Sequence, residues 1–207
     1  MNIISNNCIG GYFYREINEN FKNPFIWCVI RPNSMYNLIT QYENIDFNNI
    51  EIKKDDFYHN NKPMDCFKII IDNKVVVHYT HHHFSALHNS PTKIHCDIFY
   101  NKIWELVYNN YIKRITRMTK DPIFLLLDGK DYYNLEEDKK LLNEIKQNNR
   151  KCIFITKYKE LLSFSSDKIL ILYDKNTCID AQHGPSYYTK MFCSKILDFI
   201  KADKDHV

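Results

Sequence analysis

Long apolar runs are absent from the 207-residue sequence. A membrane-spanning helix needs about 20 consecutive apolar residues, and nothing here approaches that length, so no membrane span is predicted. The first residues, MNIISNNC, contain neither a basic leader nor a long apolar stretch. We therefore expect them to begin the fold instead of forming a secretory signal, which predicts a cytoplasmic protein.

Cysteine pairs of the CxxC type are also absent. Seven cysteines are scattered along the chain, and an odd number cannot all form disulfides, which favours a reducing compartment. Cys28, Cys152 and Cys193 lie within apolar runs, where cysteine usually behaves as a small buried hydrophobic residue. Cys8 lies outside such runs and is the best candidate for a chemical role.

Strong charge of either sign is missing too. The net charge is only +3, with basic and acidic residues interspersed, so no nucleic-acid partner is expected. Apolar residues make up 44% of the chain and aromatic residues 14%, which excludes a disordered or collagen-like protein. The length allows one domain with a real core and is too short for two of ordinary size, so residues 1–207 are interpreted as one domain.

The second half of the chain alternates between strand patterns and helix patterns. Strands are predicted over 123–127, 152–156 and 169–173, and helices over 97–118, 135–147 and 186–200. Such alternation predicts a mainly parallel sheet with helices on both faces. The expected fold class is therefore α/β, a three-layer helix-sheet-helix domain of the Rossmann-like type.

The first half carries weaker patterns. The expected elements are a short strand at 3–5, a turn at Gly10 and Gly11 into a helix over 12–20, a buried strand at 25–31, a helix over 34–41 and a polar loop over 44–59. A β-hairpin insertion is predicted from two β-branched runs, 67–71 and 75–79, on either side of a short turn. In the helix over 97–118, an apolar stripe is expected to pack into the core.

Two segments fall at the carboxyl ends of predicted strands, where open α/β sheets bind ligands. The first, SNNCIGG, places the Cys8 thiol between the first strand and a helix N-terminus. The helix dipole and backbone N–H groups are expected to lower the thiol pKa and to hold an oxyanion at Gly10 and Gly11. Asn6 or Asn7 adds a side-chain donor.

The second segment, DAQHGP, leads into the last helix. Asp180 precedes His183 by three positions, so a turn lets the carboxylate orient the imidazole as a general base. A nucleophile early in the chain and an acid and histidine late in it are what covalent acyl transfer needs. Arg15, beyond Cys8, and Asp128, after the strand at 123–127, are further candidates for substrate binding.

These residues resemble known families. The pattern Asp180-x-x-His183, followed by Pro185 and a closing helix, resembles the last block of the SGNH (GDSL-like) esterases and acyltransferases, whose acid and histidine serve a nucleophile just after strand one. This sequence has Cys8 where they carry serine, and it has no clear counterpart of their middle Gly and Asn blocks.

Four further segments, IISNNCIGGYFYRE, NPFIWCVI, HHHF and YIKRITRM, resemble two related bacterial and viral groups. One is the exopolysaccharide-biosynthesis-associated domain of unknown function 1919, and the other is the papain-like cysteine peptidase family of unknown function. The resemblance implies a Cys/His enzyme often found near surface-glycan genes, located in the host cytoplasm if viral.

Six of the nine histidines fall between His78 and His95, which raises the alternative of a metal site. His81 and His83 would point the same way on a strand, and His88, His95 or Cys96 could complete the four ligands that zinc requires. The spacing matches no standard zinc motif, and ordinary polar edge residues explain it equally. We therefore predict no metal.

Together these features predict a cysteine-dependent acyl-transfer enzyme, either a hydrolase or an acyltransferase. Its expected partner is a small-molecule, glycan or acyl-carrier substrate, and it needs no cofactor beyond an acyl donor such as a CoA thioester. Two alternatives stay open. One is a papain-like peptidase that uses the same Cys8 and His183, and the other is a non-catalytic binding or immune-evasion module in which Cys8 is merely packed.

Overall fold

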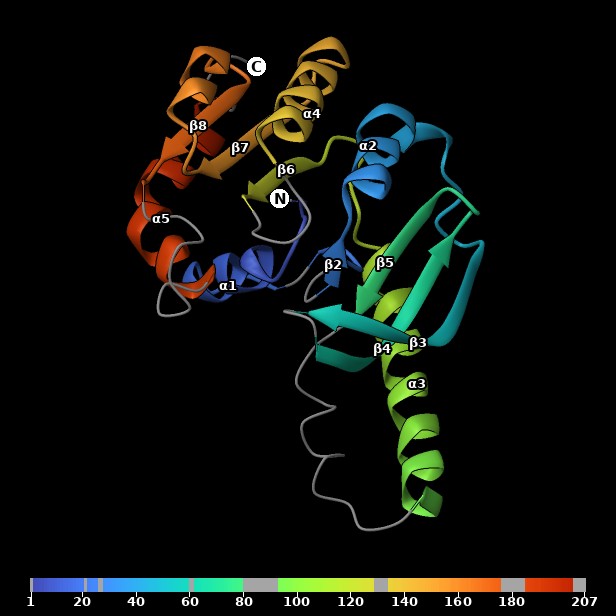
Figure 1. Ribbon diagram of the computed structural model, residues 1–207. Helices are drawn as coiled ribbons and strands as arrows, with labels where there is room; N and C mark the ends of the chain where they lie inside the picture. Colours follow the sequence, from blue (N-terminus) through green and yellow to red (C-terminus); the bar gives the residue numbers. More distant parts are fainter. Residues whose placement is uncertain are drawn as a thin grey trace.

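A computed structural model describes most of the chain. The described residues are 2–20, 22–25, 28–59, 62–79, 93–128, 134–175 and 185–202. They form an α/β domain with a four-strand parallel sheet and a separate four-strand antiparallel sheet (Figure 1). None of the helices in this part of the chain is long and apolar enough to cross a membrane.

The parallel sheet has the strand order β1-β6-β7-β8. Its strands are β1 (Ile3–Ser5), β6 (Ile123–Leu127), β7 (Lys151–Thr156) and β8 (Ile169–Tyr173). Nearly all residues of β1, β6 and β7 are buried, which is typical of strands covered on both faces. Because the strands are parallel, their carboxyl ends meet at one edge of the sheet, and β1 and β8 lie at its two sides.

Helices cover both faces of this sheet (Figure 1). On one face α1 (Ile9–Glu16) packs against α5 (Pro185–Lys201), and on the other α2 (Pro32–Gln41) packs against α4 (Leu135–Gln147). The predicted three-layer arrangement around a mainly parallel sheet is confirmed. The predicted bounds of β6, β8 and α4 agree with the structure, those of β7 differ by one residue at its start, and those of α5 differ by one residue at each end.

The antiparallel sheet has the order β2-β5-β4-β3. Its strands are β2 (Cys28–Ile30), β3 (Ile50–His59), β4 (Lys62–Ile71) and β5 (Val75–Tyr79). The predicted hairpin is confirmed as β4 and β5. Asp72 and Asn73 in its turn have φ of 50° and 52°, a left-handed conformation that Asp and Asn tolerate better than most residues.

Two local predictions are wrong and a third is confirmed in part. The loop expected over 44–59 contains β3, whose charged residues hide any apolar alternation, and a short 3₁₀ helix, η1 (Tyr42–Asn44), ends at its start. The buried segment expected over 25–31 contains β2, which pairs with β5 in the antiparallel sheet. The first helix begins at Ile9, so Gly10 and Gly11 lie inside α1 and do not form a turn.

The helix predicted over 97–118 is α3 (Lys93–Ile115). Val107 and Tyr111 of its apolar stripe are buried, as expected, but Leu106 beside them is 41% exposed and does not belong to the stripe. Tyr111 also donates a hydrogen bond from its hydroxyl to the backbone oxygen of Phe47, 3.0 Å away. The second half of α3 is therefore fixed to the body of the protein by one face.

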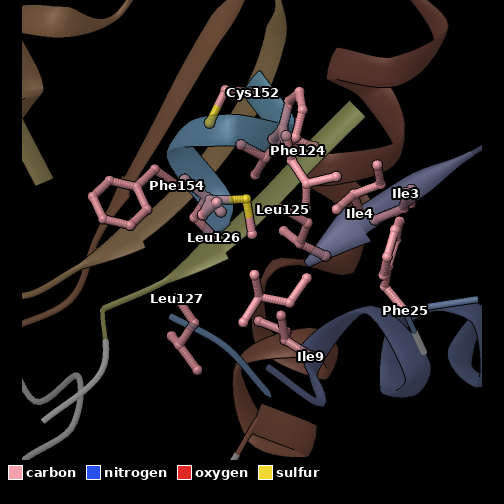
Figure 2. Close-up of a cluster of buried hydrophobic side chains, with 14 of the residues drawn as sticks. Ile3, Ile4, Ile9, Phe25, Phe124, Leu125, Leu126, Leu127, Cys152 and Phe154 are labelled. Carbon is pink, nitrogen blue, oxygen red and sulfur yellow. The ribbon is translucent and has the colours of Figure 1, made fainter. Parts of the chain in front are cut away.

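The buried side chains of both sheets belong to one hydrophobic cluster. Figure 2 shows part of it, with Ile3 and Ile4 of β1, Phe25 and several β6 residues packed together. Cys28 and Cys152 are fully buried in this cluster, which confirms the prediction for these two cysteines. Cys193, predicted to be buried as well, is only partly so.

Candidate functional site

The carboxyl edge of the parallel sheet carries the candidate site. Cys8 follows β1 and is the N-cap residue of α1, with no capping hydrogen bond from its side chain. Asp128 directly follows β6, and Lys157 directly follows β7. Because these three strands are neighbours in the sheet, the three residues lie at the edge where α/β proteins bind ligands.

Cys8 is a free, partly exposed cysteine. Burial of the thiol raises its pKa to about 11, and a backbone hydrogen bond offsets only part of this effect. The expected lowering of this pKa is therefore wrong, because desolvation outweighs the backbone hydrogen bond that favours the thiolate. A thiol of this kind needs a base to become a nucleophile.

The first backbone N–H groups of α1 are occupied by side chains of its own N-terminal loop. Ile9 N donates to Asn7 Oδ1 at 2.9 Å, and Gly10 N donates to Ser5 Oγ at 3.3 Å. The Ser5 hydroxyl in turn donates to the backbone oxygen of Asn7 at 2.8 Å. Of the backbone groups expected to hold an oxyanion, the N–H of Gly10 thus already has a partner, and Gly11 is buried within α1.

Asn6 joins three strands. Its side-chain Nδ2 donates to the backbone oxygen of Leu127 at 2.8 Å, and its Oδ1 accepts from Leu127 N at 3.0 Å. Its backbone oxygen accepts from Ile30 N at 3.0 Å. The side chain thus continues the β1 to β6 ladder while the main chain turns toward β2, so the amide predicted as a substrate donor has a structural role.

The two residues predicted to bind substrate lie in unfavourable positions for it. Arg15 is exposed in the last turn of α1, at the opposite end of that helix from Cys8. Asp128 is at the carboxyl edge but fully buried, with Oδ2 accepting from Lys157 N at 3.5 Å. Burial raises the pKa of Asp128, while the positive charge of Lys157 and a hydrogen bond from Thr156 oppose the rise.

Asp138, in the first turn of α4, was missed by the sequence reasoning. It is fully buried, and neither carboxylate oxygen has a hydrogen-bond partner in the described part of the protein. Burial and the negative charges of Asp128 and Glu137 raise its pKa to about 8. Its spacing from Leu141, Leu142 and Ile145, which form the buried stripe of α4, was the signal that places it on the core face.

Several predicted residues fall outside the described structure. Asp180 and His183 lie outside it, so their distances from Cys8 stay untested, and the same holds for His81, His83 and His88. His95 belongs to the first turn of α3. Within the described residues, no group of three or more His, Cys, Asp or Glu side chains is placed to hold a metal ion.

Comparison with known proteins adds no relative. No family model matches the chain, and no curated protein matches it significantly. The resemblances noted in the sequence therefore stay predictions.

Proposed function

We propose that this chain is a cysteine-dependent acyl-transfer enzyme, a hydrolase or an acyltransferase, with Cys8 as its nucleophile. The observation that carries the proposal is the position of this free, partly exposed thiol in the loop between β1 and α1, at the ligand-binding edge of a parallel sheet. The proposed substrate is a glycan or acyl-carrier ester or thioester.

The packing of two helices supports His183 as the partner of Cys8. Helix α5 begins two residues after His183 and packs against α1, which begins one residue after Cys8. The last turn of α5 is at the opposite edge of the sheet, because Ile200 lines a cavity of about 370 Å³ with Ile123 and Lys151, at the starts of β6 and β7. The helix therefore starts toward the edge that carries Cys8.

In the proposed reaction His183 accepts the proton from the Cys8 thiol as Sγ attacks the acyl carbon. The bond to the leaving group breaks, a thioester forms, and His183 gives the proton to the leaving group. Water or an acceptor hydroxyl then loses a proton to His183 and attacks the thioester, which releases the acyl product and restores the thiol. Asp180 orients His183.

The pKa of Cys8 makes the base essential. With a pKa of about 11, only about one thiol in ten thousand is ionised at pH 7 in the absence of a neighbouring base. Proton transfer to a positioned base during attack typically accelerates such a step by roughly 10²–10⁴-fold. Reactivity at neutral pH is therefore a sensitive measure of whether the base is present.

A non-catalytic binding module is the second candidate. The raised pKa of Cys8 and the occupied N–H groups of Ile9 and Gly10 favour it, because neither feature is arranged for catalysis. In that case Cys8 simply packs beside α1.

Alkylation of Cys8 with an iodoacetamide probe, followed by peptide mass spectrometry, separates the two candidates. For the enzyme we expect labelling of wild type at pH 7, loss of this signal in Cys8→Ala, and a rate roughly 100-fold lower in His183→Ala. Cys193→Ala is the matched control, because Cys193 is also partly exposed and lies on α5. Its labelled Cys8 peptide should be unchanged.

The pH dependence of the alkylation rate of Cys8 defines the result that would contradict the enzyme. A thiol without a base should react about tenfold faster for each unit of pH between 7 and 10, because its ionised fraction rises in that way below a pKa of about 11. Equal rates in wild type and His183→Ala, with this steep profile in both, would establish the non-catalytic module.

A further inference from the structure

The Asp138 carboxylate is buried without compensation. It is 0% exposed, and both of its oxygens lack a hydrogen-bond partner within the described residues. Burying a carboxylate is costly unless it is paired or coordinates a metal, and unsatisfied buried groups in native proteins usually mark a bound ion, a water or a catalytic role. The carboxylate therefore requires an explanation.

Capping of α4 does not supply one. The N-cap is Asn134, whose Oδ1 accepts from Glu136 N at 3.1 Å and from Glu137 N at 3.0 Å. Asp138 instead occupies the first position of the buried stripe that continues through Leu141 and Leu142. Its side chain is thus directed at the sheet, where a hydrophobic residue would be expected.

The part of the sheet beneath the start of α4 contains a second buried acid. Helix α4 connects β6 to β7, so its first turn lies at their carboxyl edge, beside Asp128. Both carboxyls are fully buried, and the charge of Asp128 acts directly on Asp138. Lys157 is the cation that acts on both, so two acids face one positive charge.

We propose that Asp128 and Asp138 bind one divalent cation of the Mg²⁺ class between the end of β6 and the first turn of α4. Mg²⁺ is usually held by one or two carboxylates and keeps several of its waters, so two protein ligands suffice. Zinc favours cysteine and histidine ligands and calcium takes many oxygen ligands, whereas this pair offers two carboxylates, which suits Mg²⁺ best.

The cation makes the buried acids compatible with the fold. With Lys157 and a divalent ion, the two carboxylates face three positive charges instead of one, and the Asp138 oxygens gain a partner. The inference does not depend on the proposed role of Cys8, because neither Cys8 nor His183 belongs to this pair. It adds a metal site to the same edge of the sheet.

Thermal unfolding of the full chain tests this site. Wild type is stripped with a chelator, dialysed, and measured at pH 7.5 with increasing MgCl₂. For a chain of this size, a cation at about a hundred times its dissociation constant raises Tm by roughly 5–10 °C. We expect this rise in wild type and its loss in Asp138→Asn and Asp128→Asn.

Glu136→Gln is the matched control, since Glu136 is an exposed acid in the same helical turn. It should respond to Mg²⁺ as wild type does. Binding of Mn²⁺, followed by the loss of its free electron-paramagnetic-resonance signal, measures the site directly and does not depend on the stability of the variants. We expect wild type and Glu136→Gln to bind one Mn²⁺ that Asp138→Asn does not bind.

Two results would overturn the site. One is a wild type whose Tm is insensitive to MgCl₂ and which leaves the Mn²⁺ signal unchanged, which would mean that Asp138 is simply a protonated acid. The other is an equal response of Asp138→Asn and wild type, which would place the cation elsewhere.

Discussion

Replacing Asn6 with leucine is expected to lower the free energy of unfolding by roughly 2–6 kcal/mol. The Asn6 amide provides both the donor and the acceptor for the backbone of Leu127, which is 5% exposed. Leucine has a similar size but no polar atoms, so it leaves a buried N–H and a buried carbonyl unpaired, at about 1–3 kcal/mol each. Urea unfolding followed by circular dichroism measures the change.

Asn7→Ala is the control for this variant. Asn7 Oδ1 accepts a hydrogen bond from Ile9 N at 2.9 Å in a partly buried position, and removing one such bond costs about 1 kcal/mol. We therefore expect a clear order, with Asn6→Leu much less stable than Asn7→Ala and Asn7→Ala slightly less stable than wild type. If Asn6→Leu is as stable as Asn7→Ala, the amide does not hold β1 and β6 together.

The sequence predicted well those strands and helices whose own apolar pattern determines their secondary structure. Strands β6 and β8 are continuous apolar runs, and α4 carries apolar residues at helical spacing, so burial on a sheet or beneath a helix leaves a clear periodic signal. The parallel three-layer arrangement follows from their alternation. These elements form the framework that supports the carboxyl edge.

Strand β3 could not be predicted, because its extended conformation is stabilised by pairing with β4 and not by a pattern in its own sequence. Its sequence, IEIKKDDFYH, lacks a consistent apolar alternation, yet it pairs with β4 from Ile50 opposite Ile71 to His59 opposite Lys62. Such a ladder is stabilised by backbone hydrogen bonds and cross-strand contacts, which do not depend on a buried face. A pattern of side chains therefore carries little information about it.

The candidate site shows the same division. The position of Cys8 after β1 follows from local pattern, and the structure agrees with it. The raised pKa of Cys8 does not follow from local pattern, because desolvation of the thiol depends on how α1 packs against the sheet and against α5. Asp138 had a usable signal, a charged residue at a core position of α4, but periodicity alone does not say whether such a residue is buried or displaced to the surface.

Replacing Asp138 with asparagine is expected to stabilise the protein in a metal-free buffer. Asparagine keeps the size of the side chain and is neutral, whereas the aspartate must take up a proton on folding, since its pKa rises from about 4 to about 8. At pH 7 the gain in the free energy of unfolding is on the order of 4 kcal/mol, which raises Tm by roughly 8–16 °C.

The sign of the effect sets its pH dependence. A carboxyl group whose pKa is raised in the folded state contributes its full stability below its unfolded pKa, and this contribution is lost as the pH rises through the folded value. Wild type should therefore lose stability between about pH 4 and pH 8 relative to Asp138→Asn, so that the difference in Tm widens with pH. Glu136→Gln should follow wild type throughout. A difference in Tm between wild type and Asp138→Asn that stays constant over this range would mean that Asp138 is charged and paired in the folded protein. Saturating MgCl₂ should narrow this difference in Tm, because the cation stabilises only wild type.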